Sequence, residues 1–309
     1  VRRYLERYAA GTVPTPAPPA PAPVASGALA DRDGYDPGFL GDGFPVPLPV
    51  PLDPIGEVAI EIDGNPPERQ YELAYRHFSV VMHRARRMAL FAATNIDGEQ
   101  TARLKRGNDA WNYDPRLPRE AQLGEDLYVS NPLDRGHLVR RLDPAWGDPG
   151  VAAEAEQDTF FWTNCAPQHS TLNRHLWLGL EDYILDSADT LGFRACIFTG
   201  PIFDDDRDPM YRDLTQIPQA FWKVAVMLAE NAADGRALSA TGYVLSQASL
   251  ITDLEFAYGP FKTYQVALSK LKEWTRLDFG AGVEAADPLA TPETPSFFIE
   301  LGSGADIRL

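Results

Sequence analysis

The sequence has few cysteines, no long apolar run and too few basic residues to balance its acidic ones. With only Cys165 and Cys196 among 309 residues, it has neither a disulfide framework nor the Cys-x-x-Cys pairs of a zinc knuckle. No stretch reaches the roughly 18 to 20 apolar residues that a membrane-spanning helix needs, so a spanning protein is not expected. No secretory signal is visible at the start, although the missing initiator Met leaves a removed signal open.

The charge balance is strongly acidic, with 28 Lys and Arg against 44 Asp and Glu and a formal net charge of −16. Such a surface argues against indiscriminate coating of nucleic acid or of an anionic membrane. The segment from His77 to Ala145 differs, because its 11 Lys and Arg outnumber its 9 Asp and Glu. Binding of a polyanion is therefore expected to be confined to a small basic cleft in this segment.

Twelve of the 27 prolines lie in the first 54 residues, mostly in two clusters. Residues 12–23 have almost nothing to bury and predict an extended, semi-rigid linker. At 44–52 proline alternates with apolar residues, which indicates a polyproline strand laid against a domain, with a ligand for a partner's groove as the alternative. We expect a proline-rich arm at 1–56, a folded domain at 57–280 and a C-terminal extension at 281–309.

Apolar runs and alternations predict short strands throughout the folded part. Helical spacing predicts a helix at 172–191, and residues 264–274 should pass from a strand into a helix. Further strands are expected at 58–62, 78–82, 88–94, 159–163, 194–199, 220–228, 237–247 and 296–301. These elements predict an α+β fold with a mainly antiparallel sheet and a few helices.

The densest cluster of reactive side chains is Asp134-Arg135-Gly136-His137, followed by Arg140 and Arg141. Histidine takes up a proton near neutral pH, since its ordinary pKa is about 6.5. A nearby aspartate can orient the imidazole, and an arginine can hold an anionic substrate. The alternative is an Asp–Arg pair in a turn beside a histidine with a structural role.

A second cluster comprises Asn164, Pro167, Gln168, Asn173, Trp177 and Glu181. Asn173 stands at the start of the predicted helix, and Glu181 follows about 80° around the helix axis, so both side chains can face one site. An amide and a carboxylate offer oxygen ligands, which suit a hydrated Mg²⁺. The five histidines have no H-E-x-x-H or paired-ligand spacing, which disfavours zinc.

The sequence resembles the DNA/RNA non-specific endonucleases of the ββα-metal (His-Me finger) fold, the endonuclease G-like group. The resemblance rests on three motifs in this order: Asp-Arg-Gly-His, Thr-Asn-x-x-Pro-Gln and Leu-Asn-x-x-x-Trp-x-x-Leu-Glu. The resemblance extends from about residue 58 to about residue 280. It implies a central antiparallel sheet with flanking helices and hydrolysis of phosphodiester bonds in DNA and RNA. It also implies Mg²⁺ as the cofactor, with Mn²⁺ or another divalent ion able to substitute.

The resemblance also implies roles for single residues. His137 would be the general base that takes a proton from the attacking water, and Asn164 would support the site by hydrogen bonding near it. Asn173 would bind the metal directly, and Glu181 would hold and orient metal-bound waters. A single metal can neutralise the phosphate and supply a water as the acid for the leaving oxygen.

The arginines are assigned less closely by the resemblance. Arg106 is our choice for the residue that stabilises charge on the phosphorus centre, although the spacing to Trp111 leaves Arg103 and Lys105 open. Arg135 would lie near the substrate or the scaffold of the site. Phosphate contacts are predicted for Arg140 and Arg141.

We therefore predict a Mg²⁺-dependent endonuclease acting on DNA and RNA substrates, with no membrane association. The rival is a nucleic-acid or protein-binding module that kept the fold and lost turnover, and a third reading is an enzyme acting on a smaller phosphodiester. The resemblance allows a homodimer. The proline-rich arm allows a regulatory protein or domain, as part of a longer polypeptide.

Other features are interpreted as structural. Cys165 is expected to be a small buried hydrophobe, because no base is placed beside it. The acidic run at 204–208 lacks the Gly and terminal Glu of an EF-hand and indicates a solvated loop. Core packing is expected of Trp111, Trp146, Trp162 and Trp177.

Overall fold

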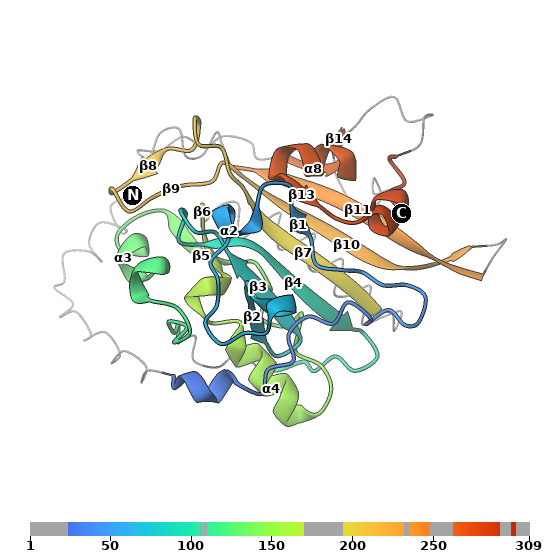
Figure 1. Ribbon diagram of the computed structural model, residues 1–309, viewed down its shortest axis with the longest axis horizontal. Helices are drawn as coiled ribbons and strands as arrows, with labels where there is room; N and C mark the ends of the chain where they lie inside the picture. The colour runs from blue at the N-terminus through green and yellow to red at the C-terminus, as the bar shows by residue number, and fades with distance from the viewer. Residues whose placement is uncertain are drawn as a thin grey trace, which may run out of the picture.

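The computed structural model describes residues 24–105, 107, 110–169, 194–231, 235–247, 262–290 and 298–300. At its centre is an antiparallel sheet of eight strands in the order β14-β12-β11-β10-β7-β4-β3-β2 (Figure 1). These strands are β2 (Glu72–Tyr75), β3 (Phe78–Met82), β4 (Ala89–Asp97), β7 (Arg194–Ile202), β10 (Ala220–Asn231), β11 (Gly235–Ser246), β12 (Lys262–Val266) and β14 (Phe298–Glu300).

Smaller elements surround this sheet. Three two-stranded pairs are β1 (Val50–Pro51) with β13 (Leu277–Asp278), β5 (Leu133–His137) with β6 (Cys165–His169), and β8 (Met210–Tyr211) with β9 (Thr215–Gln216). The described α-helices are α2 (Ile55–Val58), α3 (Glu125–Tyr128), α4 (Pro149–Asp158), α8 (Leu268–Thr275) and α9 (Ala281–Ala285). Short 3-10 turns are η1 (Ser26–Leu29), η2 (Pro67–Arg69), η3 (Arg119–Ala121) and η4 (Trp162–Asn164). The predicted α+β class with a central antiparallel sheet is confirmed.

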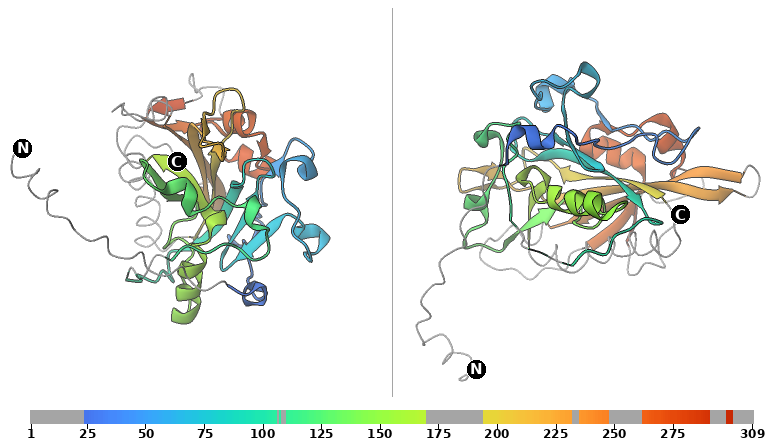
Figure 2. Two further views of the ribbon diagram at one scale, coloured as in Figure 1. Left: turned by 90° about the vertical axis from the view of Figure 1, so that its left-hand side faces the viewer. Right: turned by 90° about the horizontal axis from the view of Figure 1, so that it is seen from below.

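Apolar side chains alternate along the central strands, so both faces of the large sheet are buried. In β10, Phe221 and Ala225 belong to one core cluster, whereas Trp222, Val224 and Val226 belong to the other. The hairpin of β10 and β11 extends well beyond the neighbouring strands, as Figure 2 shows.

Different segments cover the two faces. Leu138 and Val139, which follow β5, pack in the first cluster, so the chain leaving the β5–β6 pair is anchored on that face. Leu268 and Leu271 of α8 and Val283 of α9 pack in the second cluster.

The proline-rich stretch at 44–52 lies against the folded domain, as predicted. Val46 is fully buried, and its carbonyl accepts a hydrogen bond of 2.7 Å from the hydroxyl of Tyr35. The Tyr35 ring packs 5.5 Å from the ring of Phe198 in β7. Strand β1 then pairs with β13, which continues the covering of the second face.

Two predicted strands are wrong. Residues 58–62 form no strand, because β2 and β4 already occupy both edges of β3, and only Ala59 forms a bridge, with His83. Residues 159–163 are buried, but they form a turn and the start of η4 with one bridge at Phe161.

Other expectations have different outcomes. The predictions at 78–82, 88–94, 194–199, 220–228, 237–247 and 264–274 match β3, β4, β7, β10, β11 and the passage from β12 into α8. The predicted helix at 172–191 and the linker at 12–23 lie outside the described residues. Within the described ranges, no helix is long and apolar enough to cross a membrane.

Candidate active site

The Asp-Arg-Gly-His and Thr-Asn-x-x-Pro-Gln motifs meet in one antiparallel ribbon, the β5–β6 ribbon. Strand β5 ends at His137, which pairs with Cys165, the first residue of β6. Asn164 directly precedes this pair. The ribbon is hydrogen-bonded separately from the eight-stranded sheet, and its pairing brings together two motifs that are distant in sequence.

Gly136 is required by the close approach of the two strands. A Cβ at this position would overlap the side chain of Gln168, which is fully buried and has little room to move. Glycine therefore lets the Gln168 amide lie against the backbone of β5. Among the described residues, neither Oε1 nor Nε2 of this amide has a hydrogen-bond partner. Such a buried amide is a candidate to bind a water or a ligand group.

Asn164 holds the chain that leaves β5. Its Oδ1 accepts a hydrogen bond from the N–H of Val139 (2.9 Å), and its Nδ2 donates to the carbonyls of Val139 (2.9 Å) and Thr159 (3.0 Å). Its carbonyl accepts a bond from the N–H of Leu138 (3.1 Å). The Asn164 side chain is fully buried, so it fixes the two residues that follow His137.

Aromatic rings surround the half-buried His137. The centroid of Trp111 lies 4.7 Å from that of the imidazole with a tilt of 47°, and Phe160 lies at 5.1 Å, edge to face at 87°. Trp111 packs in turn on Trp162 at 5.2 Å. These contacts restrict rotation of the imidazole. The buried positions of Trp111 and Trp162 agree with their predicted role in packing.

Cys165 packs on the same side of the ribbon as His137. Its sulfur lies 3.1 Å from the hydroxyl of Tyr128, and both residues are buried. Burial raises the pKa of the Cys165 thiol to about 12. The thiol therefore stays protonated at neutral pH, and the interpretation of Cys165 as a buried hydrophobe is confirmed.

A buried polar network supports the turn before β6. The hydroxyl of Tyr75 donates to the carboxylate of Asp114 (2.5 Å) and lies 2.5 Å from the hydroxyl of Thr163. Asp114 also pairs with Arg116 (2.6 Å), whose guanidinium packs over the Tyr75 ring. Burial, together with the charge of Asp114, raises the pKa of Tyr75 well above its ordinary value. The network ties Thr163, the neighbour of Asn164, to β2.

The other end of β6 is anchored from the large sheet. Gln247, which follows β11, accepts a hydrogen bond from the N–H of His169 (2.8 Å). Its Nε2 donates to the carbonyls of Pro167 (3.3 Å) and Pro218 (2.6 Å). The sequence offers no signal for this fully buried anchor, because 78 residues separate Gln247 from His169.

The predicted basic residues have different surroundings. Arg135 is exposed and pairs with Glu125 (3.1 Å). Arg141 pairs with Glu156 of α4 and donates to the carbonyl of Leu104. Arg140 follows the ribbon and is half-buried.

The remaining predicted residues are only partly described. Asp134 is half-buried, and its charge acts on His169, whose pKa is lowered by burial. Outside the described residues lie Arg106, Asn173 and Glu181.

The implied divalent metal can be tested against the chemistry of the donors. Within the described ranges, no group of three His, Cys, Asp or Glu side chains could hold an ion by itself. On the β5–β6 ribbon Asp134 pairs with Gln168, so these two side chains share the face opposite to that of His137 and Cys165 and are not assigned to the metal. The amide of Asn173 and the carboxylate of Glu181 are oxygen donors of the kind that suits a hard, hydrated ion.

Comparison with known proteins decides the family. The sequence model of the DNA/RNA non-specific endonucleases matches residues 58–286, which include the whole β5–β6 ribbon. The chain belongs to this family. Its resemblance to the DNA/RNA non-specific endonucleases is thereby confirmed.

Individual relatives are similar over different lengths. Uncharacterized protein y4fB of Sinorhizobium fredii is 40% identical over 285 residues, which cover 85% of this chain and 41% of that protein. Mitochondrial endonuclease G of Bos taurus is 34% identical over 76 residues, or 25% of this chain and 23% of the relative. The chain thus spans less than half the length of these two relatives.

A solved structure has the same fold. A chain in the crystal structure of the EndoG/EndoGI complex superposes with a TM-score of 0.53 and 19% identity. The match covers 69% of this chain and 86% of that chain.

Proposed function

We propose that this endonuclease-family protein is a Mg²⁺-dependent, sugar-non-specific endonuclease that hydrolyses phosphodiester bonds in DNA and RNA. The observation that carries the proposal is the β5–β6 ribbon, in which His137 and Asn164 of two separate motifs lie side by side. Family membership supports the substrate class.

In this mechanism His137 is the general base. Its imidazole takes the proton of the water that attacks phosphorus, which requires the neutral ring in a fixed orientation. Trp111 and Phe160 restrict the ring, and Asn164 fixes the backbone after it.

The remaining residues stabilise the negative charge of the phosphate or hold the metal ion. Arg106 stabilises the negative charge that develops on the non-bridging oxygens, and Arg135, Arg140 and Arg141 contact the substrate or its flanking phosphates. Asn173 and Glu181 would hold the hydrated Mg²⁺. When bound, the ion supplies positive charge to the phosphate and a proton donor for the leaving oxygen.

The test is cleavage of plasmid, single-stranded DNA and RNA by the purified protein with Mg²⁺ or with EDTA. We expect cleavage of all three with Mg²⁺, none with EDTA, and none by His137→Ala. His83→Gln is a matched control at pH 8, because His83 lies in the loop after β3 and outside the ribbon. Unchanged cleavage by His137→Ala would contradict the assignment of the base. Binding without cleavage under any divalent ion would favour the binding-module alternative.

A further inference from the structure

Exposed apolar side chains gather on one side of the molecule, away from the β5–β6 ribbon. Of the six large apolar side chains that are exposed in the described residues, four belong to this group: Val50, Leu52, Ile55 and Trp274. Val50 and Leu52 flank Pro51 of β1, Ile55 begins α2, and Trp274 lies in the last turn of α8, just before β13. Exposed apolar groups concentrated in this way mark a surface that binds another molecule.

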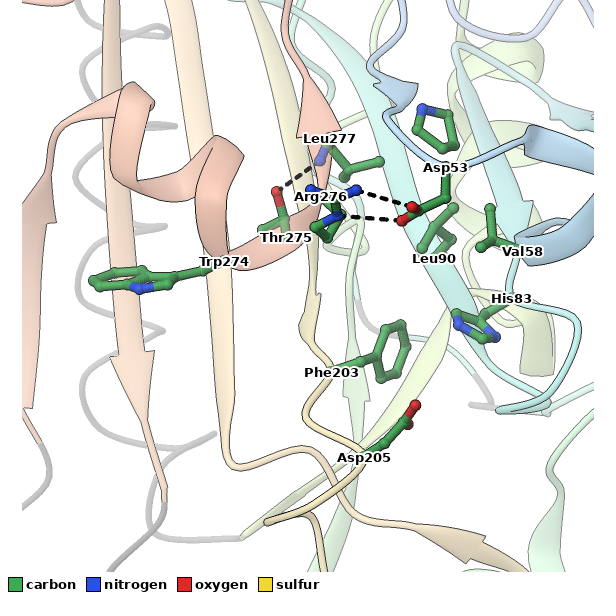
Figure 3. A pocket seen from close by; sticks show the side chains of 11 residues that line it. Asp53, Val58, His83, Leu90, Phe203, Asp205, Trp274, Thr275, Arg276 and Leu277 are labelled. Atoms are coloured by element: carbon green, nitrogen blue, oxygen red, sulfur yellow. Dashed lines mark hydrogen bonds and ion pairs between the residues drawn. The ribbon is translucent and has the colours of Figure 1, made fainter.

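The apolar group borders a pocket of about 220 Å³, shown in Figure 3. Val58, Leu90 and Leu277 form an apolar part of its wall, and Phe203 and Trp274 also line it. The pocket therefore combines an apolar and aromatic part with polar and charged side chains, which include Asp53, Asp205 and Arg276.

The charged groups of the pocket leave it with an acidic character. Arg276 donates to both carboxylate oxygens of Asp53 (2.9 and 3.2 Å), so these two charges offset each other. The carboxylate of Asp205 is 88% exposed. It shares the guanidinium of Arg86 with the buried carboxylate of Asp208, at 2.6 and 3.2 Å. One cation between two carboxylates leaves a net negative charge.

His83 adds no positive charge to this wall at neutral pH. Its Nδ1 accepts hydrogen bonds from the N–H groups of Ala85 (3.1 Å) and Arg86 (3.3 Å). Burial, with the nearby charge of Arg86, lowers the pKa of His83 to about 4. The ring packs edge to face on Phe203 at 4.8 Å and completes a neutral aromatic wall.

We propose that this pocket binds a Lys or Arg side chain of a partner protein, with the partner's adjacent aliphatic side chains packed on the four exposed apolar residues. Asp205 pairs with the cation, and the ring of Phe203 contacts its stem, whereas Trp274 contributes to the apolar surface beside the pocket. A phosphate-bearing ligand fits poorly, because the lining of the pocket carries two carboxylates, those of Asp53 and Asp205, against one guanidinium, that of Arg276. A second copy of the chain is disfavoured, since each copy has a net charge of −16.

The pocket residues lie outside the β5–β6 ribbon, so the proposal stands independently of the nuclease activity. The test uses a fluorescein-labelled peptide, Ser-Leu-Arg-Leu-Ser, titrated with the full chain and followed by fluorescence anisotropy. Matched peptides replace the arginine by glutamate or both leucines by serine. We expect both replacements to weaken binding by about fivefold or more.

Variants locate the site. Asp205→Asn is expected to weaken binding of the Arg peptide by about threefold to tenfold, and Trp274→Ala by about tenfold. Asp206→Asn is the control, because it removes the same charge from the same loop at an exposed residue that does not line the pocket. Thermal unfolding checks that the variants remain folded. Arg86 retains Asp208 as a partner in Asp205→Asn.

Three outcomes would overturn the proposal. Equal loss in Asp205→Asn and Asp206→Asn would show general attraction to an acidic surface. Equal binding of the peptide without leucines would show that the apolar group is not used. Dimerisation that Trp274→Ala abolishes, with no binding of the Arg peptide, would assign the surface to a second copy.

Discussion

Replacing Gly136 by alanine tests the packing of the β5–β6 ribbon most directly. The new Cβ would overlap three side-chain atoms of Gln168, whereas ordinary contacts of a Cβ begin at 3.4 Å. Since Gln168 is fully buried, the overlap has to be relieved by moving the strands apart. Overpacking of this kind costs about 1–3 kcal/mol of the free energy of unfolding. That corresponds to a change of about 5- to 150-fold in the ratio of folded to unfolded protein.

The measurement is equilibrium unfolding in urea, followed by circular dichroism. Gly150→Ala is the matched control, because a Cβ at Gly150 in the first turn of α4 meets nothing within 4 Å. Alanine there is expected to stabilise the protein by about 0.5–1 kcal/mol. In a Gln168→Ala background, Gly136→Ala should lose most of its cost, with a coupling of about 1–2 kcal/mol between the two positions.

Two results would refute this reasoning. One is a Gly136→Ala protein as stable as Gly150→Ala. The other is an unchanged cost of Gly136→Ala after Gln168 has been shortened, because the clash with that side chain would then not be its cause. Cleavage measured on the same variants would show whether the spacing of the ribbon also matters for activity.

Three further predictions concern buried polar groups. The pKa of His83 is about 6.5 in the unfolded chain and about 4 in the folded protein, so protonation of this ring favours the unfolded chain. The contribution of His83 to the free energy of unfolding is therefore complete above pH 6.5 and is lost as the pH falls toward 4. His83 should account for about 2 kcal/mol of the loss between pH 8 and pH 5, and His83→Gln should reduce the loss by that amount in urea unfolding at the two pH values. Tyr75→Phe leaves Asp114 and Thr163 without its hydroxyl and should lower the free energy of unfolding by about 1–3 kcal/mol. Gln247→Ala should accelerate hydrogen exchange at the N–H of His169, and unchanged exchange would contradict the anchor.

Strands with strong apolar patterns could be predicted from sequence, because burial on both faces of the sheet leaves a long apolar run. The runs that became β3, β4 and β10 are of this kind. Residues 58–62 carry an equally good alternation and still form no strand: β2 and β4 pair with β3, and only Ala59 bridges the chain just after β3, at His83. Helix α4 was missed because its sequence is dominated by small and acidic residues and has no apolar stripe.

The residues of the candidate site were recognisable, but the contacts that position them were not. Strand β5 has no apolar alternation, so its pairing with β6 follows only from the three-dimensional structure. A supporting role could be predicted for Asn164, because it belongs to the Thr-Asn-x-x-Pro-Gln motif. Its hydrogen bonds to Val139, two residues after His137, agree with that role. The amide of Gln168 and the anchor at Gln247 depend on which strands meet, which local sequence does not encode.

The position of Gln247 late in the chain also determines when the hydrogen bonds at the end of β6 can form during biosynthesis. Strand β6 leaves the ribosome well before β11, so the N–H of His169 and the carbonyl of Pro167 have no bond to Gln247 while the intervening chain is being made. Their final hydrogen bonds can form only after residue 247 has been translated and has emerged. The end of the ribbon is therefore completed late, when both long strands of the β10–β11 hairpin are already present.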